Sequence, residues 1–354
     1  MSKECNRCLN DKTVRKMRIY SDGACNYCHN FDTKAAELKD YRHLEKLFLQ
    51  RVNAVKGKYD YDAAVGISGG KDSTYVLYQL IHKYNLKVKA FTLDNGFLSA
   101  EARKNIDKIV KDLNVEHEYI EFDKDVLRKF YRYSMKKWLT PCIACSYMGY
   151  ATMINYTSKI NAGICVHGRG LDQMMRYYGN DVFTTLVDEG LKEHKDTDIT
   201  ALYQRLLDNI SSKLGSQMRE DIEQTFLSDA KHNDFREFVA YFLYHPYNKG
   251  DIIKFLEENT SWRVKSDQKE HYDCEIHNAA KYIYQCAEGR PHSLPELSVQ
   301  VRAGELTKQQ ARKILDGQTY TKEPTAELNR LCDYVNLSKQ ALLAKAKIYR
   351  WLPK

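Results

Sequence analysis

Residues 61–73 of the chain read YDAAVGISGGKDS. The short apolar run Asp62–Ile67 is typical of a strand buried on both faces, and residues Ser73–Tyr84 have the pattern of a helix. Two adjacent glycines between them let the backbone approach a ligand closely, and the start of the helix presents unpaired N–H groups. The hydroxyls of Ser68 and Ser73 and the ammonium of Lys71 add donors. The loop therefore predicts an anion site.

Asp72 follows Gly69, Gly70 and Lys71 within this loop. A carboxylate beside phosphate groups is a typical contact of Mg²⁺. The loop therefore predicts a phosphate ligand accompanied by Mg²⁺ at Asp72. Its spacing differs from the G-x-x-x-x-G-K-[ST] phosphate loop.

Strand and helix patterns alternate after this loop, which predicts a parallel α/β sheet covered on both faces. Ligands of such sheets bind at the carboxyl ends of the strands. Asp94, at the end of the second strand, is placed either to meet a ribose or to hold its loop by hydrogen bonds. The expected strands are 88–93, 116–122 and 163–166, and the expected helices are 100–113, 126–139 and 147–160.

Strand signals fade beyond Asp188, and the rest of the chain has helical patterns. We expect a zinc ribbon in residues 1–34, the α/β domain in 35–190, and a helical extension in 191–354 that contributes to the substrate pocket. The helices expected in this extension are 202–214, 235–244, 251–257, 277–286, 307–315 and 338–351.

Four of the 10 cysteines form two pairs near the N-terminus, Cys5-x-x-Cys8 and Cys25-x-x-Cys28. Four thiolates with this spacing can surround one Zn²⁺ tetrahedrally, which leaves no open position for a substrate. So short a segment cannot bury a core of its own, and a bound metal would order it. The pattern predicts a structural zinc site.

The hexapeptide SGGKDS at 68–73 resembles the signature of the PP-loop ATP pyrophosphatase superfamily, and VHGRGLD at 166–172 resembles its second nucleotide loop. The resemblance implies a PP-loop (HUP-like) α/β/α fold and cleavage of ATP between the α and β phosphates, with adenylation of a substrate oxygen. It adds Gly168, Arg169 and Asp172 to the ATP site. Asp172 is followed by Gln173 where some members carry a second acid.

Three further stretches resemble the N-acetyl sugar amidotransferase family over nearly the whole chain. They are the N-terminal cysteine pairs, the Pro141-Cys142-x-x-Cys145 element, and the segment 289–308. That resemblance implies conversion of an acetamido group to an acetamidino group with ammonia from a separate glutaminase.

Cys142, Cys145 and Cys274 resemble the three thiolates that hold a four-iron four-sulfur cluster in PP-loop thiolation enzymes. The resemblance implies a free iron that carries sulfide to the adenylated substrate, with Lys71 and Asp72 acting at the phosphates. We place the Cys142-x-x-Cys145 pair in a loop between two helices. A persulfide and disulfide pair, or a structural or zinc role, are the alternatives. Cys165 is expected in the core.

The residues after Cys145 narrow the substrate class. The Lys-Arg pair that follows this position in similar transfer-RNA thiolases is absent, which disfavours transfer RNA and favours a nucleobase, nucleotide or sugar. The last 54 residues carry 11 Lys and Arg against 5 Asp and Glu, so a nucleic-acid-binding protein is a third hypothesis beside the two enzymes.

No apolar run approaches the roughly 20 residues of a bilayer helix, and the first residues, MSKEC, have no signal core. We expect a cytoplasmic enzyme without a membrane anchor, and leave a homodimer open.

Overall fold

The computed structural model describes residues 4–14, 16–32, 40–170, 207–227, 236–263 and 273–351. Within these ranges one sheet of parallel strands has the order β3-β2-β1-β4-β5. The strands are β1 (Tyr61–Gly66), β2 (Val88–Leu93), β3 (Glu116–Ile120), β4 (Ala162–His167) and β5 (Glu237–Ala240). This confirms the predicted α/β class. The strand order reverses between β1 and β4, where sheets of this kind bind ligands.

Helices cover both faces of the sheet. Successive residues of β1 point to opposite sides, so both faces carry apolar side chains that pack against helices. Ala64 packs in one cluster with Tyr156 of α7 (Cys142–Lys159). Val65 lies in the main core together with Val76 of α4 (Lys71–His82). The central residues 62–65 of the strand that carries the loop are therefore buried, as its short apolar run predicts.

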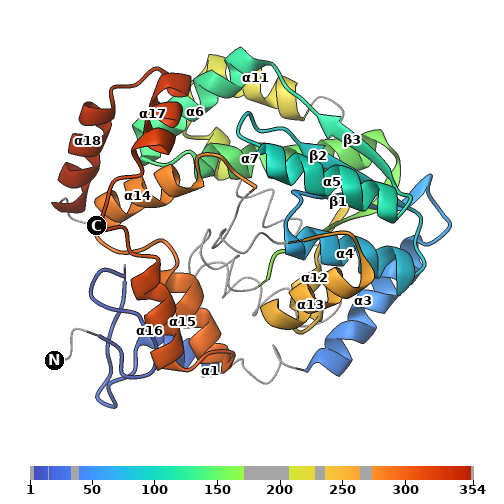
Figure 1. The fold of residues 1–354 in the computed structure, drawn as a ribbon, viewed down its shortest axis with the longest axis horizontal. Coiled ribbons are helices and arrows are strands. Elements are labelled where there is room, and N and C mark those ends of the chain that lie inside the picture. Colours follow the sequence, from blue (N-terminus) through green and yellow to red (C-terminus); the bar gives the residue numbers. More distant parts are fainter. Residues whose placement is uncertain are drawn as a thin grey trace.

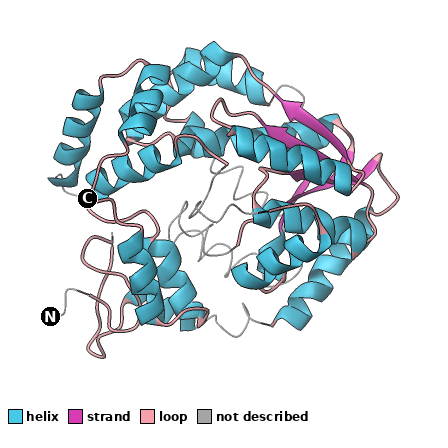
Figure 2. Cartoon of the chain, viewed as in Figure 1, coloured by secondary structure: helices cyan, strands magenta, loops and turns pink. Residues whose placement is uncertain are grey.

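Of the remaining helices, the one of residues 100–112 lies beside the strands, whereas those of residues 277–351 lie away from the sheet (Figure 1). Figure 2 shows that helices make up most of the molecule, with the strands gathered on one side. The helices are α1 (Asn26–Asp32), α3 (Tyr41–Val55), α5 (Ala100–Asp112), α6 (Lys124–Trp138), α11 (Ser216–Phe226), α12 (Tyr241–Tyr244), α13 (Lys249–Asn259), α14 (His277–Glu288), α15 (Leu294–Ala303), α16 (Lys308–Gly317), α17 (Thr325–Val335) and α18 (Lys339–Trp351).

The helix expected over 235–244 is wrong for its first half. Glu237–Ala240 form β5, which pairs with β4 from Ile164↔Glu237 to His167↔Ala240, and only Tyr241–Tyr244 are helical. A short buried apolar run has no periodicity that separates strand from helix. Pairing with β4 decides it, so the predicted helical extension also supplies an edge strand.

Several of the expected helices are present, although their ends differ from the expected ones. The helix expected from Thr307 begins at Lys308, because Thr307 and Gln310 form a reciprocal capping box. Helices α3, α11, α15 and α17 were not anticipated. None of the described helices is long and apolar enough to cross a membrane.

Candidate active site and metal centre

The loop after β1 is shaped by its glycines. Gly69 has a φ of +75°, and a Cβ there would lie 2.6 Å from the carbonyl oxygen of Ala102 in α5. Gly70 occupies the N-cap position of α4 and brings no side chain to cap the helix. The N–H groups of the first turn of α4 therefore face the loop, where an anion can accept them.

Lys71 and Asp72 form an ion pair at the start of α4, with 2.9 Å between Nζ and Oδ2. The other carboxylate oxygen of Asp72, Oδ1, is buried and accepts no hydrogen bond. A buried acceptor without a partner costs free energy. The orphaned oxygen is therefore suited to a cation bound together with phosphate groups, as Mg²⁺ is.

The end of β4 meets this loop. A Cβ at Gly168 would lie 2.9 Å from the backbone carbon of Asp72, so only glycine allows this approach. Arg169 lies over the ring of Tyr150, 4.9 Å from its centroid, and donates to its hydroxyl. These contacts place the backbone of the second predicted nucleotide loop against the first. Asp172 lies outside the described residues.

His167, at the end of β4, is buried and accepts a hydrogen bond from the N–H of Arg169 at 3.3 Å. Burial, with a smaller contribution from the Arg169 charge, lowers the pKa of His167 to about 3. The imidazole is therefore neutral at physiological pH. These contacts give His167 a hydrogen-bonding role at the end of β4.

Asp94 holds its own loop. Its Oδ1 accepts from the N–H of Gly96 at 3.0 Å, and its Oδ2 pairs with Arg103 at 2.7 Å. Of the two roles considered for Asp94, these contacts match the structural one. A ribose contact stays a prediction.

Trp262 was missed by the sequence reasoning. Its buried indole donates from Nε1 to the carbonyl of Gly69 at 2.9 Å. The two residues are 193 positions apart, and no local motif marks Trp262. It fixes the glycine loop from the side.

The Cys142-x-x-Cys145 pair lies in the first turn of α7, so its predicted placement in a loop between two helices is wrong. Pro141 at the N-cap position starts the helix, since proline is tolerated where no N–H bond is required. Residues three apart share one face of a helix. Both thiols therefore lie on one face of the first turn of α7.

Cys274 joins this pair from a distant part of the chain. It forms an isolated antiparallel bridge with Leu98, in the loop after β2. Burial raises the pKa of the Cys274 thiol, and the nearby thiols of Cys145 and Cys142 raise it further. Asn95 donates from Nδ2 to the Sγ of Cys145 at 3.3 Å. The three predicted thiols thus gather at the carboxyl edge of the sheet, and we name them the thiol centre.

The thiol centre is not packed tightly enough for a single ion. Among the described residues, Cys5, Cys8, Cys25 and Cys28 are the one group of at least three candidate ligands that all lie within 4.8 Å of one another. An iron-sulfur cluster is larger than one ion, so its thiolates stand farther apart. A donor set of three thiols fits such a cluster with one iron left open. Cys165, in contrast, is buried in β4 as expected.

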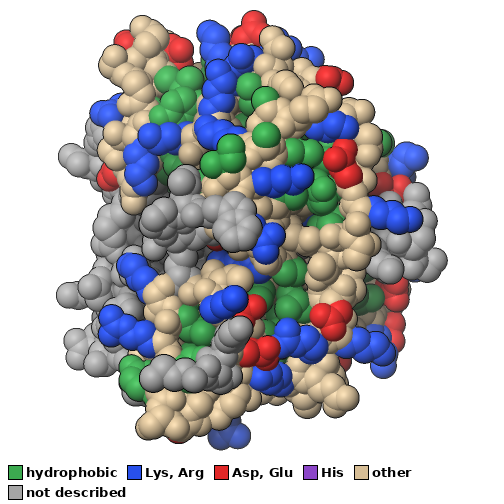
Figure 3. Space-filling view, turned by 90° about the vertical axis from the view of Figure 1, so that its left-hand side faces the viewer, with side chains coloured by type: hydrophobic (Ala, Val, Ile, Leu, Met, Phe, Trp, Pro, Cys, Tyr) green, Lys and Arg blue, Asp and Glu red, His purple; other side chains and the backbone are tan. Residues whose placement is uncertain are grey.

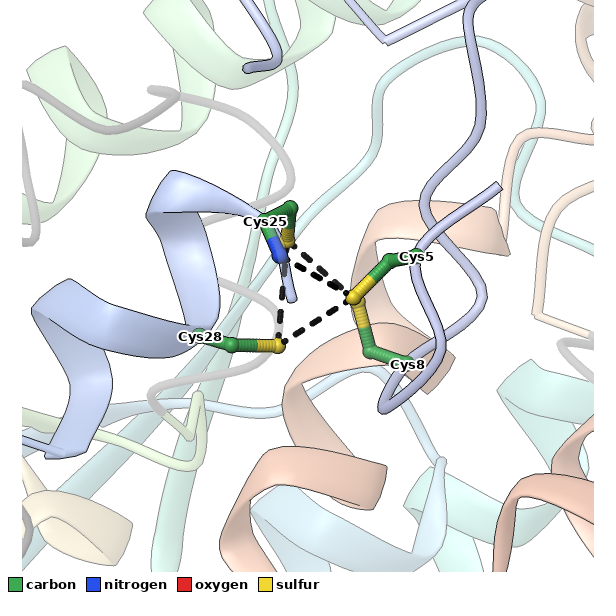
Figure 4. Close-up of side chains that lie close together, drawn as sticks. All are labelled: Cys5, Cys8, Cys25 and Cys28. Carbon is green, nitrogen blue, oxygen red and sulfur yellow. Dashed lines mark hydrogen bonds between the residues drawn. The ribbon is translucent and has the colours of Figure 1, made fainter. Parts of the chain in front are cut away.

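The four N-terminal thiols form a compact group, which we name the knuckle (Figure 4). Sγ atoms lie 3.7 Å apart in the pairs Cys5–Cys28, Cys8–Cys25 and Cys25–Cys28. A tetrahedron with metal–sulfur bonds of about 2.3 Å has edges of about 3.8 Å. All four thiols are buried. The knuckle has the dimensions of a tetrahedral metal site with no position open to a substrate.

The knuckle packs against α15 and α16. Leu9 lies in one cluster with Leu297 and Leu315. Lys308 donates from Nζ to the carbonyl of Cys5 at 2.6 Å and pairs with Glu4 at 3.0 Å. The N-terminal segment and helices α15 and α16 therefore form one unit.

Many basic residues near the C-terminus have partners inside the molecule. Arg312 and Lys308 pair with Glu4, and Lys339 pairs with Glu323. Figure 3, which views the left-hand side of Figure 1, shows Lys and Arg interspersed with Asp and Glu. The ion pairs of Lys308, Arg312 and Lys339 therefore satisfy part of the basic charge near the C-terminus within the molecule.

No family model matches the chain, and no curated protein gives a significant match. Among solved structures, the chain is similar to the U34-tRNA thiolase NcsA from Methanococcus maripaludis with its 4Fe-4S cluster. The TM-score is 0.37 and the identity 15%, over 95% of this chain and 96% of that one.

The chain is also similar to the NH3-dependent NAD synthetase of Campylobacter jejuni, with a TM-score of 0.31 and 13% identity, over 56% of this chain and 98% of that one. It is likewise similar to the NMN synthetase of Francisella tularensis, with a TM-score of 0.30 and 14% identity, over 56% of this chain and 99% of that one. These similarities are distant, so function is inferred from the geometry of the site.

Proposed function

We propose that the chain is an ATP-dependent enzyme that adenylates a carbonyl or amide oxygen of a small molecule and replaces that oxygen with sulfur. The observation that carries the proposal is the meeting of two sites at one edge of the sheet. The loop of residues 68–73 ends in an uncapped helix N-terminus, and the Cys274 segment bridges the loop after β2 beside Cys145.

In the first step, the substrate oxygen attacks the α-phosphorus of ATP, and pyrophosphate leaves. The N–H groups at the start of α4 and the ammonium of Lys71 would hold the phosphates, and the Asp72 carboxylate would hold Mg²⁺. Arg169 would offset the negative charge that builds during the transfer. In the second step, sulfide attacks the activated carbon, AMP leaves with the original oxygen, and the proton of the sulfide goes to solvent.

Cys142, Cys145 and Cys274 would hold a 4Fe-4S cluster, which supplies a free iron as the docking point for sulfide. The knuckle would hold Zn²⁺ in a structural role through Cys5, Cys8, Cys25 and Cys28. The distance of 3.7 Å between neighbouring Sγ atoms supports this role. Persulfide chemistry at the thiol centre is the alternative to a cluster.

The first test is the content of zinc, iron and acid-labile sulfide in protein purified without oxygen. We expect one zinc and about four irons per chain, with absorbance near 400 nm. Cys274→Ser should lose the iron and keep the zinc. Cys286→Ser changes a half-buried cysteine of α14 and should keep both metals.

The second test separates sulfur from nitrogen transfer. AMP and pyrophosphate are measured with uridine, UMP or UDP-N-acetylglucosamine as acceptor, and with sulfide or ammonium chloride as donor. Sulfide-dependent turnover that Cys274→Ser abolishes is expected. An iron-free Cys274→Ser variant with full activity would contradict the proposal.

The second candidate is an N-acetyl sugar amidotransferase that keeps the adenylation and takes ammonia from a partner glutaminase. One observation favours it: the knuckle and the segment 289–308, which carry that sequence resemblance, pack together through Lys308 and Cys5. Turnover with ammonium chloride alone, in protein that holds zinc without iron, would favour this candidate.

A further inference from the structure

The segment of residues 273–275 runs antiparallel beside the loop after β2. The N–H of Ser99 donates to the carbonyl of Asp273 at 3.1 Å, and the N–H of Glu275 donates to the carbonyl of Phe97 at 2.9 Å. The bridge between Leu98 and Cys274 lies between these two bonds. The backbone of the segment is therefore fixed to the loop after β2.

Two neighbouring side chains of this segment reach two different sites. The buried carboxylate of Asp273 lies near Ser68, Lys71 and Asp72 of the nucleotide loop. The thiol of Cys274 lies near Cys145. Successive side chains of an extended segment point to opposite sides. One short segment thus contacts both the nucleotide loop and the thiol centre.

Ser68 links Asp273 to the nucleotide. A serine hydroxyl has one proton to donate, and an ionised carboxylate only accepts. A Ser68 hydroxyl that donates to Asp273 cannot donate at the same time to a phosphate in the loop. A bound phosphate competes for this proton, and its negative charge opposes the carboxylate of Asp273.

We propose that Asp273 is a positioning residue through which ATP binding at the loop changes the exposure of the Cys274 thiol. The proposal rests on the proposed function only for ATP binding, since the coupling requires no sulfur transfer. Linkage makes it reciprocal: a ligand held by Cys274 changes the affinity for ATP by the same factor.

The test uses the full-length protein as purified, with and without Mg-ATP, and with ATP binding measured separately by calorimetry. The exposure of the Cys274 thiol is measured by its rate of alkylation by iodoacetamide, or by the rate at which bound iron is released to a ferrous chelator. We expect ATP to change the rate about fivefold or more in the unmodified protein. The rate of alkylation of Cys286, measured in the same digest, should not change when ATP is added.

Three variants locate the coupling. Asp273→Ala and Ser68→Ala should bring the ATP-dependent change in rate below about twofold, since each removes one of the two neighbouring side chains that the coupling needs. Asp273→Asn can still accept from Ser68 and should restore part of the change, which a simple loss of folding would not produce. Thermal melting of each variant reports its fold.

Two outcomes overturn the proposal. One is an unmodified protein that binds ATP with no change at Cys274, and the other is an Asp273→Ala variant with the full change. The test distinguishes this proposal from the proposed function. Coupling without sulfide-dependent turnover would support the role of Asp273 and contradict sulfur transfer, whereas turnover without coupling would contradict the role of Asp273. Failure to bind ATP would remove both.

Discussion

Arg302 donates from Nη1 to the Sγ of Cys8 at 3.5 Å, although the two residues are 294 positions apart. A donor to a metal-bound thiolate stabilises its negative charge, and loss of such outer contacts weakens metal binding about 10- to 100-fold. The contact also ties α15 to the knuckle, so the knuckle and the C-terminal helices are expected to depend on the same metal.

Arg302→Ala should therefore weaken zinc affinity about tenfold or more, measured by competition with a coloured chelator. Lys313→Ala, an exposed position of α16, is the matched control and should bind zinc as the unmodified protein does. Equal affinities in the two variants would contradict a role for Arg302 at the metal.

Gly168→Ala should weaken ATP binding. The added Cβ would lie 2.9 Å from the backbone carbon of Asp72 and 3.1 Å from the N–H nitrogen of Ser73. Relief of such overpacking costs about 1–3 kcal/mol, so the dissociation constant should rise about tenfold. Calorimetry with Mg-ATP measures it.

Gly149→Ala in α7 is the control for this substitution, because a Cβ added at Gly149 would have nothing within 4 Å. It should leave ATP binding unchanged and stabilise the protein by up to about 1 kcal/mol, since alanine favours helix over glycine. If Gly168→Ala binds ATP as tightly as Gly149→Ala, the two loops do not meet as described.

Asn95→Asp should weaken retention of iron. The substitution keeps the Oδ1 that accepts from the N–H of Phe97 at 2.9 Å, but it replaces the donor to Cys145 with a negative charge. Like charges beside a thiolate destabilise it. We expect about tenfold faster loss of iron to a chelator. Asn209→Asp, at an exposed position, should lose iron at the unmodified rate.

His245 should make stability depend on pH. Its Nε2 lies 2.6 Å from the hydroxyl of Tyr84, and its Nδ1 lies 3.0 Å from the carbonyl of Tyr241. Burial lowers its pKa from 6.5 to about 4. The hydrogen bond to the Tyr241 carbonyl raises the pKa in part, and the charges of Lys83 and Glu45 make smaller contributions that lower and raise it, respectively. Between these values the unfolded chain binds a proton that the folded chain does not, so stability falls as pH falls from 6.5 towards 4.

At pH 5 this residue alone should lower the free energy of unfolding by about 2 kcal/mol relative to neutral pH. Urea unfolding at pH 5 and 7.5 measures it, and His245→Gln should show a smaller difference between the two. His43→Gln, at an exposed position, should keep the original difference. A His245→Gln variant with an unchanged difference would contradict the assignment.

The parts of the protein that could be predicted from sequence are those specified by neighbouring residues. The strand 88–93 was placed correctly because alternation and turn residues are local. The knuckle was predicted from the spacing of Cys5, Cys8, Cys25 and Cys28, and the loop 68–73 from glycines next to a buried strand. In each case the chemistry depends on residues only a few positions apart.

Tertiary structure alone decided the rest. Glu237–Ala240 became a strand because β4 offered an open edge, a property that no window of sequence contains. Trp262 reached Gly69, and Asp273 reached Ser68, only after the chain had folded back on itself. Cys274 could be grouped with Cys145 from resemblance, but its position depends on backbone pairing with Leu98. Contacts between residues far apart in sequence depend on packing of whole elements, which local patterns do not encode.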